Sequence, residues 1–318
     1  MMTLQEIYEL GIKLGMKADP RGLTGVEKAM ARTKKEFTEL SEKNKEEFDP
    51  EVFNNPYADS RILFGDPTTT VKRIMAGIDI GTGEMVLADR LSEKGEKIDL
   101  VLSHHPEGGA LAGLADVMHI QIDLHEQAGV PVNVAESLLD KRISEVRRRF
   151  WPLNHFQAVD AAKLLNIPLM SMHTATDNLV YSFLKKLIDA KNPETVGDVL
   201  RLLKEIPEYK EAVRQGVGPM LFTGSEKRRA GKVVPIEITG GTEGSKELYE
   251  KMSQAGVGTI VAMHASEEHR TEAEKHHLNL VIAGHISSDS LGMNLLLDEI
   301  EKRGVSILPC SGLIRVKR

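Results

Sequence analysis

The chain has 318 residues, a formal charge of -6 from 41 Lys+Arg against 47 Asp+Glu, and 41% hydrophobic residues. At ~150 residues per domain, this length predicts about two domains, and the composition excludes a disordered chain. The acidic balance also excludes a broadly basic nucleic-acid binder, although a local contact with nucleic acid stays open.

Three further features of the sequence bear on the cellular compartment in which the protein works. The single cysteine, Cys310, cannot form an internal disulfide, as is usual in cytosolic proteins. No apolar run approaches the ~20 residues that span a bilayer, and the acidic, amphipathic start MMTLQEIYELGIKLG is unlike a signal peptide. We therefore expect a soluble, cytoplasmic protein with no membrane partner.

Residues 1–70 are predicted to form an N-terminal helical extension. Within it, the highly charged segment 26–48 has apolar residues at helical spacing. A solvated surface helix explains this segment better than a helix that binds a partner.

After residue 70, short apolar β-branched runs alternate with longer stretches of helical spacing. Seven runs predict strands: Ile74–Ile80, Ile98–Leu102, Pro168–Met172, Val233–Thr239, Gly258–Met263, Leu278–Ala283 and Val305–Leu308. Five stretches predict helices: Ala110–Gly129, Glu136–Phe150, Asn178–Ala190, Thr195–Ile206 and Lys246–Ala255. This alternation indicates an α/β fold with a parallel or mixed sheet.

The proline-punctuated, polar region 191–231 is the best candidate for a linker between two halves. We accordingly predict one α/β lobe at 71–190 and a second at 232–318. No internal repeat relates the two halves.

Histidines follow four of the predicted strands, two of them with an aspartate close behind. These residues are His104 and His105 after IDLVL, His173 with Asp177 after PLMSM, His264 after GTIVAM, and His285 with Asp289 after LNLVIA. In open α/β sheets, ligands gather at the carboxyl ends of the strands, so these side chains can meet there. His285 and Asp289 share one face if a helix begins at His285.

Imidazole and carboxylate together suit Zn, Fe or Mn. Three histidines and two carboxylates are too many for one tetrahedral ion with an open position. They suit two divalent ions bridged by a carboxylate and a water, an arrangement that supports hydrolysis. A single histidine at a strand end is more often structural, but four such features in one chain favour a site.

The motifs also carry a family resemblance. SHHP at 103–106, HTATD at 173–177 and AGHISSD at 283–289 resemble, in order, three boxes of the Nif-three-like family, the homologues of GTP cyclohydrolase type 2. The glycine-rich turn 240–244 agrees with that order, and the resemblance covers roughly residues 70–318.

The resemblance implies two linked α/β lobes with mixed sheets and a dinuclear metal site in the cleft between them, and a toroidal homohexamer. The implied metal ligands are His104, His105, Asp177, His285 and Asp289, with Asp177 as a bridging carboxylate. The chain departs from the family where Asp289 replaces a glutamate, where Ala175 replaces an asparagine, and where His264 stands in place of an acidic residue.

Two residues are candidates for moving a proton, His264 and Asp79. His264 could instead be an extra metal ligand or the partner of one, and a structural role explains Asp79 equally well. Two other features are weaker. The turn GGTEGS at 240–245 resembles a phosphate cradle, but it matches no nucleotide-binding fingerprint, and a plain strand-to-helix turn is favoured. The basic runs Arg147–Arg149 and Lys227–Arg229 could contact phosphates, but solvation is favoured for both.

These features predict a metal-dependent hydrolase that acts on a nucleotide-like or phosphorylated small molecule; ring-opening hydrolysis of GTP is implied by the resemblance alone. The alternative is a metal-binding scaffold or regulatory partner without turnover. A phosphoesterase of the Asp-His-His class is disfavoured, because Ser103 stands where that motif needs aspartate.

Overall fold

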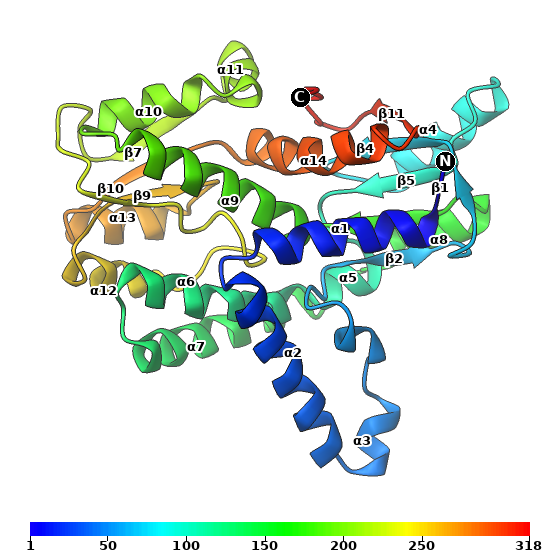
Figure 1. Cartoon of the computed structure of the whole chain (residues 1–318), viewed down its shortest axis with the longest axis horizontal. Helices are drawn as coiled ribbons and strands as arrows, with labels where there is room; N and C mark the ends of the chain where they lie inside the picture. Colours follow the sequence, from blue (N-terminus) through cyan, green and yellow to red (C-terminus); the bar gives the residue numbers. More distant parts are fainter.

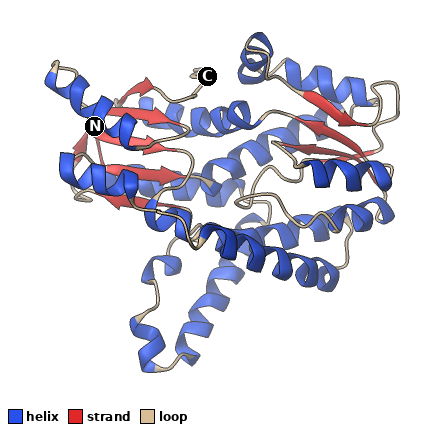
Figure 2. Ribbon diagram, turned by 180° about the vertical axis from the view of Figure 1, so that it is seen from behind, coloured by secondary structure: helices blue, strands red, loops and turns tan.

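A computed structural model describes all 318 residues, and it has two main sheets that lie side by side with helices around and between them (Figures 1 and 2). The large sheet has the strand order β11-β4-β5-β6-β2, and the small sheet has the order β7-β10-β9-β8. None of the helices combines the length and the apolar character that crossing a membrane requires.

The strands are β1 (Met2–Thr3), β2 (Ser60–Phe64), β3 (Thr70–Val71), β4 (Arg73–Gly77), β5 (Leu100–Ser103), β6 (Leu169–Met172), β7 (Met220–Thr223), β8 (Lys232–Val234), β9 (Val257–Ala262), β10 (Asn279–Ile282) and β11 (Ser306–Pro309). The helices are α1 (Leu4–Ala18), α2 (Gly22–Glu39), α3 (Glu42–Glu46), α4 (Thr82–Glu93), α5 (Gly108–Ala112), α6 (Ile120–Ala128), α7 (Val132–Phe150), α8 (Gln157–Leu165), α9 (Thr174–Lys191), α10 (Val196–Lys204), α11 (Pro207–Arg214), α12 (Leu248–Gln254), α13 (Glu267–Lys275) and α14 (His285–Glu301), with 3-10 turns η1 (Pro50–Phe53) and η2 (Leu114–His119).

Both sheets are mixed. In the large sheet, β11, β4, β5 and β6 run parallel and the edge strand β2 is antiparallel to β6. In the small sheet, β8, β9 and β10 run parallel and the edge strand β7 is antiparallel to β10. The predicted α/β class with mixed sheets is therefore confirmed.

All seven predicted strands occur, but the one expected at Val233–Thr239 stops early. The strand β8 ends at Val234 because Pro235 has no N–H to donate to the ladder. Glu237 then takes a positive φ of 64°, which an extended strand cannot accommodate. The edge strands β2 and β7 were not predicted. Each is paired on one side and half exposed, so neither shows a continuous apolar run.

The single helix expected at Ala110–Gly129 is wrong. The chain there forms α5, η2 and α6 in succession, and the first break falls at Gly113. A Cβ at Gly113 would lie 2.8 Å from the Cβ of Ala58. The close passage of the segment before β2 thus explains why a glycine, and a break, occur at this point.

The charged segment 26–48 also forms two helices rather than one. The helices α2 and α3 make an arm that projects from the body (Figure 1). At the arm, Phe37, Phe48 and Phe53 pack together, with ring centroids 4.8 to 5.4 Å apart. Val26 is the only buried residue of α2, in agreement with a solvated helix.

The strand pairing crosses the boundaries of the expected division into 1–70, 71–190, 191–231 and 232–318. That division stays a prediction about which segments fold as units. The strand β2 of the expected extension and β11 of the expected second lobe both join the large sheet. The expected linker contains α10, α11 and β7 of the small sheet. One core of 41 buried apolar residues includes Leu100 of the large sheet and Val281 of the small sheet, so the two halves share their interior.

Two close helix contacts position the later part of the chain. At Gly15 of α1, an added Cβ would lie 2.9 Å from the Cβ of Ala175 on α9. At Gly292 of α14, it would lie 2.5 Å from the backbone oxygen of Thr176. Because α9 and α14 approach this closely, Asp177 and Asp289 of these helices are brought to the same place.

The buried ring of His125 on α6 predicts a pH-dependent stability. Both of its ring nitrogens lack a hydrogen-bond partner, and burial lowers its pKa from 6.5 to about 4. The unfolded chain therefore binds a proton that the native ring rejects, and stability falls as the pH drops from about 6.5 to about 4. The full loss expected from this ring is about 3 kcal/mol.

Urea unfolding of the wild type and of His125→Phe at neutral pH and near pH 4 measures this contribution. We expect the free energy of unfolding to fall by less in the variant than in the wild type. The exposed His119 provides the control, since His119→Gln should retain the wild-type pH dependence. An equal pH dependence in wild type and His125→Phe would contradict the assignment to His125.

Candidate metal centre

The histidines predicted at strand ends lie together in the structure. His104 and His105 follow β5, and His173 follows β6. His285 follows β10 of the other sheet and is the first residue of α14, so His285 and Asp289 do share one helix face. Three overlapping groups have ligand atoms within 4.8 Å of one another: His104 with His105 and His173, His105 with His285 and Asp289, and His104 with Asp177 and Asp289.

Asp289 lies at the centre of this cluster. Its Oδ1 is 3.4 Å from Nε2 of His104, and its Oδ2 is 3.5 Å from Nε2 of His105 and 3.6 Å from Nε2 of His285. Asp177 Oδ1 lies 3.5 Å from the same Nε2 of His104. These separations exceed ordinary N–H···O distances, so the groups face one another across a gap.

The atoms that face this gap are buried and unpartnered. No hydrogen bond reaches His104 Nε2, Asp177 Oδ1 or either carboxylate oxygen of Asp289. Leaving such groups buried without partners costs several kcal/mol in total. Nitrogen and carboxylate oxygen donors are the ligands that Zn, Fe and Mn accept, so the residues present fit divalent metal ions.

The hydrogen bond at Nδ1 of His104 also favours a metal ion at this place. Thr176 Oγ1 lies 2.7 Å from the backbone oxygen of Met172 and 3.1 Å from His104 Nδ1. Because its only proton goes to a backbone carbonyl, the hydroxyl accepts a proton from His104 Nδ1. In the neutral ring, Nε2 then directs a lone pair at the carboxylates of Asp177 and Asp289. A cation between them relieves that repulsion.

Carboxylates hold two other rings from behind. His105 Nδ1 is 2.7 Å from Asp79 Oδ1, and His173 Nδ1 is 2.8 Å from the buried Asp59 Oδ2. Such carboxylate–histidine pairs fix the orientation and the tautomer of imidazoles that bind metals. His173 Nε2 in turn lies 3.7 Å from Asp177 Oδ2.

The ionisable groups of this cluster have strongly displaced pKa values. Burial raises the pKa of Asp177 to about 6. Burial opposes ionisation of Asp289 as well, but His104, His105 and His285 outweigh it and lower its pKa. For His105, burial favours the neutral ring, yet Asp289 and Asp79 together raise its pKa to about 10. Burial lowers the pKa of His285 to about 4.

His264 and Asp79, the residues predicted to move a proton, occupy different positions. The ring of His264 lies 4.5 Å from that of His285, centroid to centroid, and its Nδ1 is 2.9 Å from Glu243 Oε1. It lines the same small cavity as Asp177 and Asp289. Asp79 is exposed and its Oδ1 contacts His105 from behind, so it does not face the gap.

The loop 237–243 covers this cavity. Gly240 and Gly241, with φ values of 91° and 85°, allow it to fold back over the histidines. The space that remains is about 20 Å³, which is room for about one water molecule. The side chains of His105 and His285 nevertheless stay partly exposed to solvent.

Sequence reasoning did not include three residues of this region among the candidates. His173 was noted after its strand but was not included among the ligands. Asp59 precedes the unpredicted strand β2 and had no recognisable signal. Glu243 lies in the GGTEGS turn, which carried no indication of a contact with His264.

The fold and the buried cluster together define an α/β protein with a site suited to metal ions. Among solved structures, a NIF3 superfamily protein from Sphaerobacter thermophilus matches with a TM-score of 0.71 and 27% identity, over 80% of this chain and 92% of that chain. This similarity supports a place for the chain among the NIF3-like proteins. No protein-family model and no curated protein matches the chain.

Two other solved structures match over most of their length. Reduced HcgD from Methanocaldococcus jannaschii has a TM-score of 0.47 and 14% identity, over 84% of this chain and 94% of that chain. A Bacillus cereus protein related to NIF3 has a TM-score of 0.40 and 11% identity, over 81% and 92%. Both superpose too loosely to carry weight.

Proposed function

We propose that this chain is a metal-dependent hydrolase with two divalent ions, and that it acts on a nucleotide-like or phosphorylated small molecule. The observation that carries the proposal is the position of Asp289, whose two buried oxygens face different histidines. A carboxylate in that position is suited to bridge two ions. Asp289, rather than Asp177, is therefore the bridging residue that we propose.

Each ion would have its own set of ligands. His104, Asp177 and Asp289 Oδ1 would hold one, and His105, His285 and Asp289 Oδ2 would hold the other. The aspartate, where the family has a glutamate, is sufficient because α9 and α14 approach closely at Gly292. His173 adjoins the first set through Asp177. We propose zinc, iron or manganese, since the donors suit all three.

Bound ions would supply Lewis-acid chemistry, polarising the scissile centre and acidifying water. The protein's own groups orient the site and move the proton. Asp79, Asp59 and Thr176 hold the three rings of His105, His173 and His104. His264 is the proton carrier that we favour over Asp79, because it lines the cavity while Asp79 lies behind His105.

The experiment that tests this proposal is the Asp177→Ala variant, assayed with a panel of nucleotides that includes GTP. We expect turnover to fall by at least about a thousandfold, as is usual when a reaction loses an essential part of its catalytic machinery. The far-UV circular dichroism spectrum should be unchanged. Asp189→Ala, an exposed aspartate on the same helix α9, should retain wild-type turnover.

The second candidate is a metal-binding scaffold without turnover, which the cavity of only about 20 Å³ favours. If wild-type protein loaded with two ions consumes no nucleotide of the panel, this reading replaces the hydrolase. Assembly into a homohexamer and location in the cytoplasm stay predictions, and size-exclusion chromatography with light scattering tests the first of them.

A further inference from the structure

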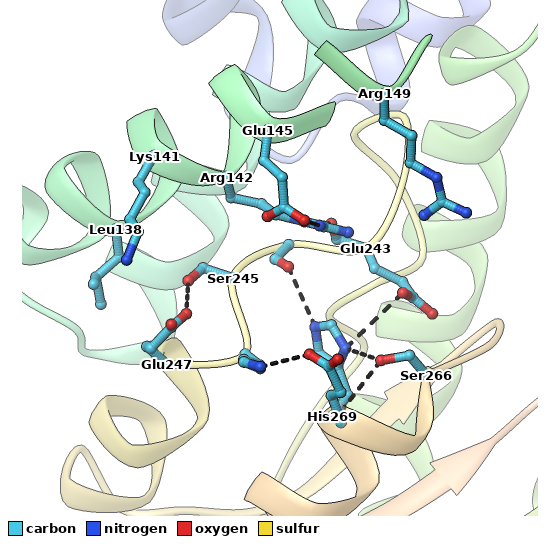
Figure 3. A pocket seen from close by; sticks show the side chains of 13 residues that line it. Leu138, Lys141, Arg142, Glu145, Arg149, Glu243, Ser245, Glu247, Ser266 and His269 are labelled. Atoms are coloured by element: carbon cyan, nitrogen blue, oxygen red, sulfur yellow. Dashed lines mark hydrogen bonds and ion pairs between the residues drawn. The ribbon is translucent and has the colours of Figure 1, made fainter. Parts of the chain in front are cut away.

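A second cavity shares Glu243 with the small cavity of the candidate metal centre, and Figure 3 shows the side chains that line it. It has a volume of about 340 Å³ and is lined by α7, residues 243–247 and the first turn of α13. Pockets that bind small molecules begin at roughly this size. Its lining is almost entirely polar, and Leu138 is the one hydrophobic residue in it.

Four cations line this cavity. Lys141, Arg142 and Arg149 extend from α7 (Figure 3). Lys246 comes from the segment 243–247. Arg142 pairs with Glu145 at 3.0 Å, and Lys246 pairs with Glu268. Lys141 and Arg149 have no ion pair, and their exposed side chains reach the cavity directly.

The carboxylates of the cavity, in contrast, all have partners. Glu145 and Glu268 are taken by the two ion pairs just described. Ser245 donates its hydroxyl to Glu247, and His264 contacts Glu243 at 2.9 Å. The lining thus carries four carboxylates against four cations, and the two charged side chains that have neither an ion pair nor a hydrogen bond are the cations Lys141 and Arg149.

Two weak sequence signals for phosphate meet at this place. The basic run Arg147–Arg149 contributes Arg149, and the turn GGTEGS contributes Glu243, Gly244 and Ser245. Arg142 Nε donates to the backbone oxygen of Glu243 at 3.1 Å, which ties α7 to that turn. Taken alone, the turn is best explained as a strand-to-helix turn and the basic run as a solvated surface, but their meeting at one cavity is better explained by a ligand.

We propose that this cavity binds a phosphate or pyrophosphate group. The guanidinium of Arg149 can offer two parallel N–H donors to phosphate oxygens, and Lys141 supplies a second positive charge. Glu243 lines both this cavity and the metal cleft. A further step rests on the proposed function: the bound group is the anionic end of the molecule that is hydrolysed at the metal centre.

Calorimetric titration of the metal-stripped, full-length protein with inorganic pyrophosphate tests the cavity without any contribution from bound ions. We expect binding that weakens with added salt. Each lost cation should weaken it by about tenfold, so Lys141→Ala/Arg149→Ala should weaken it by about a hundredfold. The control is Arg148→Ala, the adjacent arginine on α7, whose guanidinium contacts Ser144 and does not line the cavity.

Absence of pyrophosphate binding to the wild type, or an equal loss in Arg148→Ala, overturns the proposal. If the protein binds pyrophosphate but turns over no nucleotide, the cavity keeps its assignment as an anion site and the proposed hydrolase function is wrong. With turnover established, competitive inhibition by pyrophosphate supports the substrate's anionic end as the occupant. Inhibition that is not competitive overturns the assignment to the substrate's anionic end, and the occupant of the cavity is then a free anion.

Discussion

Replacing Asp289 with asparagine should empty the metal centre. The substitution removes the charge shared by both proposed ion positions, and it leaves an amide where His104, His105 and His285 face a carboxylate. Removing a hydrogen-bond partner of a ligand weakens metal binding by roughly 10–100-fold. Because Asp289 is itself a proposed ligand, its substitution should weaken metal binding by more than that. Elemental analysis of protein purified without an affinity tag measures it.

Two companions make this experiment specific. Asp298→Asn changes another buried aspartate of α14, one that pairs with Arg315, and it should retain the wild-type metal content. Asp289→Glu restores the charge with the longer side chain that the family resemblance implies, and it should recover binding. An unchanged metal content in Asp289→Asn would remove Asp289 from the site.

The double variant His104→Ala/His105→Ala should lose both the metal and the stability that metal provides. Wild-type protein is expected to contain about two equivalents of metal, because the two ligand sets divide at Asp289. At a free-ion concentration a thousand times Kd, one bound ion adds about 4 kcal/mol to the free energy of unfolding. A chelator should therefore lower the melting temperature of the wild type and leave that of the double variant unchanged.

The chain provides a matched control for this pair. His276 and His277 are also adjacent histidines, but they lie at the C-terminal end of α13 and belong to none of the three groups of candidate ligands. His276→Ala/His277→Ala should behave as the wild type does in both measurements. If no metal binds to the wild type even after reconstitution with zinc, manganese or iron, the histidines are structural and the hydrolase mechanism is wrong.

Much of the fold could be predicted because its interior strands are continuous apolar runs. Strands such as β5 and β10 are buried along their whole length, and that leaves a plain mark in the sequence. The carboxyl-end rule then brings His104, His105 and His173 to one edge of the large sheet without knowledge of the strand order. His285 follows a strand of the small sheet, so its place beside them depends on how the two sheets meet. The metal roles of these residues stay predictions.

What could not be predicted depends on contacts between distant segments. Asp59 is placed behind His173 by the antiparallel pairing of β2 with β6, and a half-exposed edge strand leaves no clear pattern. The central position of Asp289 follows from the close approach of α9 and α14 at Gly292, which no spacing within one segment reports. For the same reason Arg149 and Glu243 were separate weak signals until the fold placed them in one cavity.

The path of the chain between the sheets sets the order in which this centre is built during synthesis. His105 and His285 face each other at 3.3 Å although 180 positions separate them in the chain. At typical translation rates, that interval takes roughly 10–40 s. An emerging chain thus presents its first imidazoles well before the central carboxylate has left the ribosome. Under the proposed function, an ion that arrived early would find an incomplete set of ligands, and tight binding would wait for the small sheet and α14 to form.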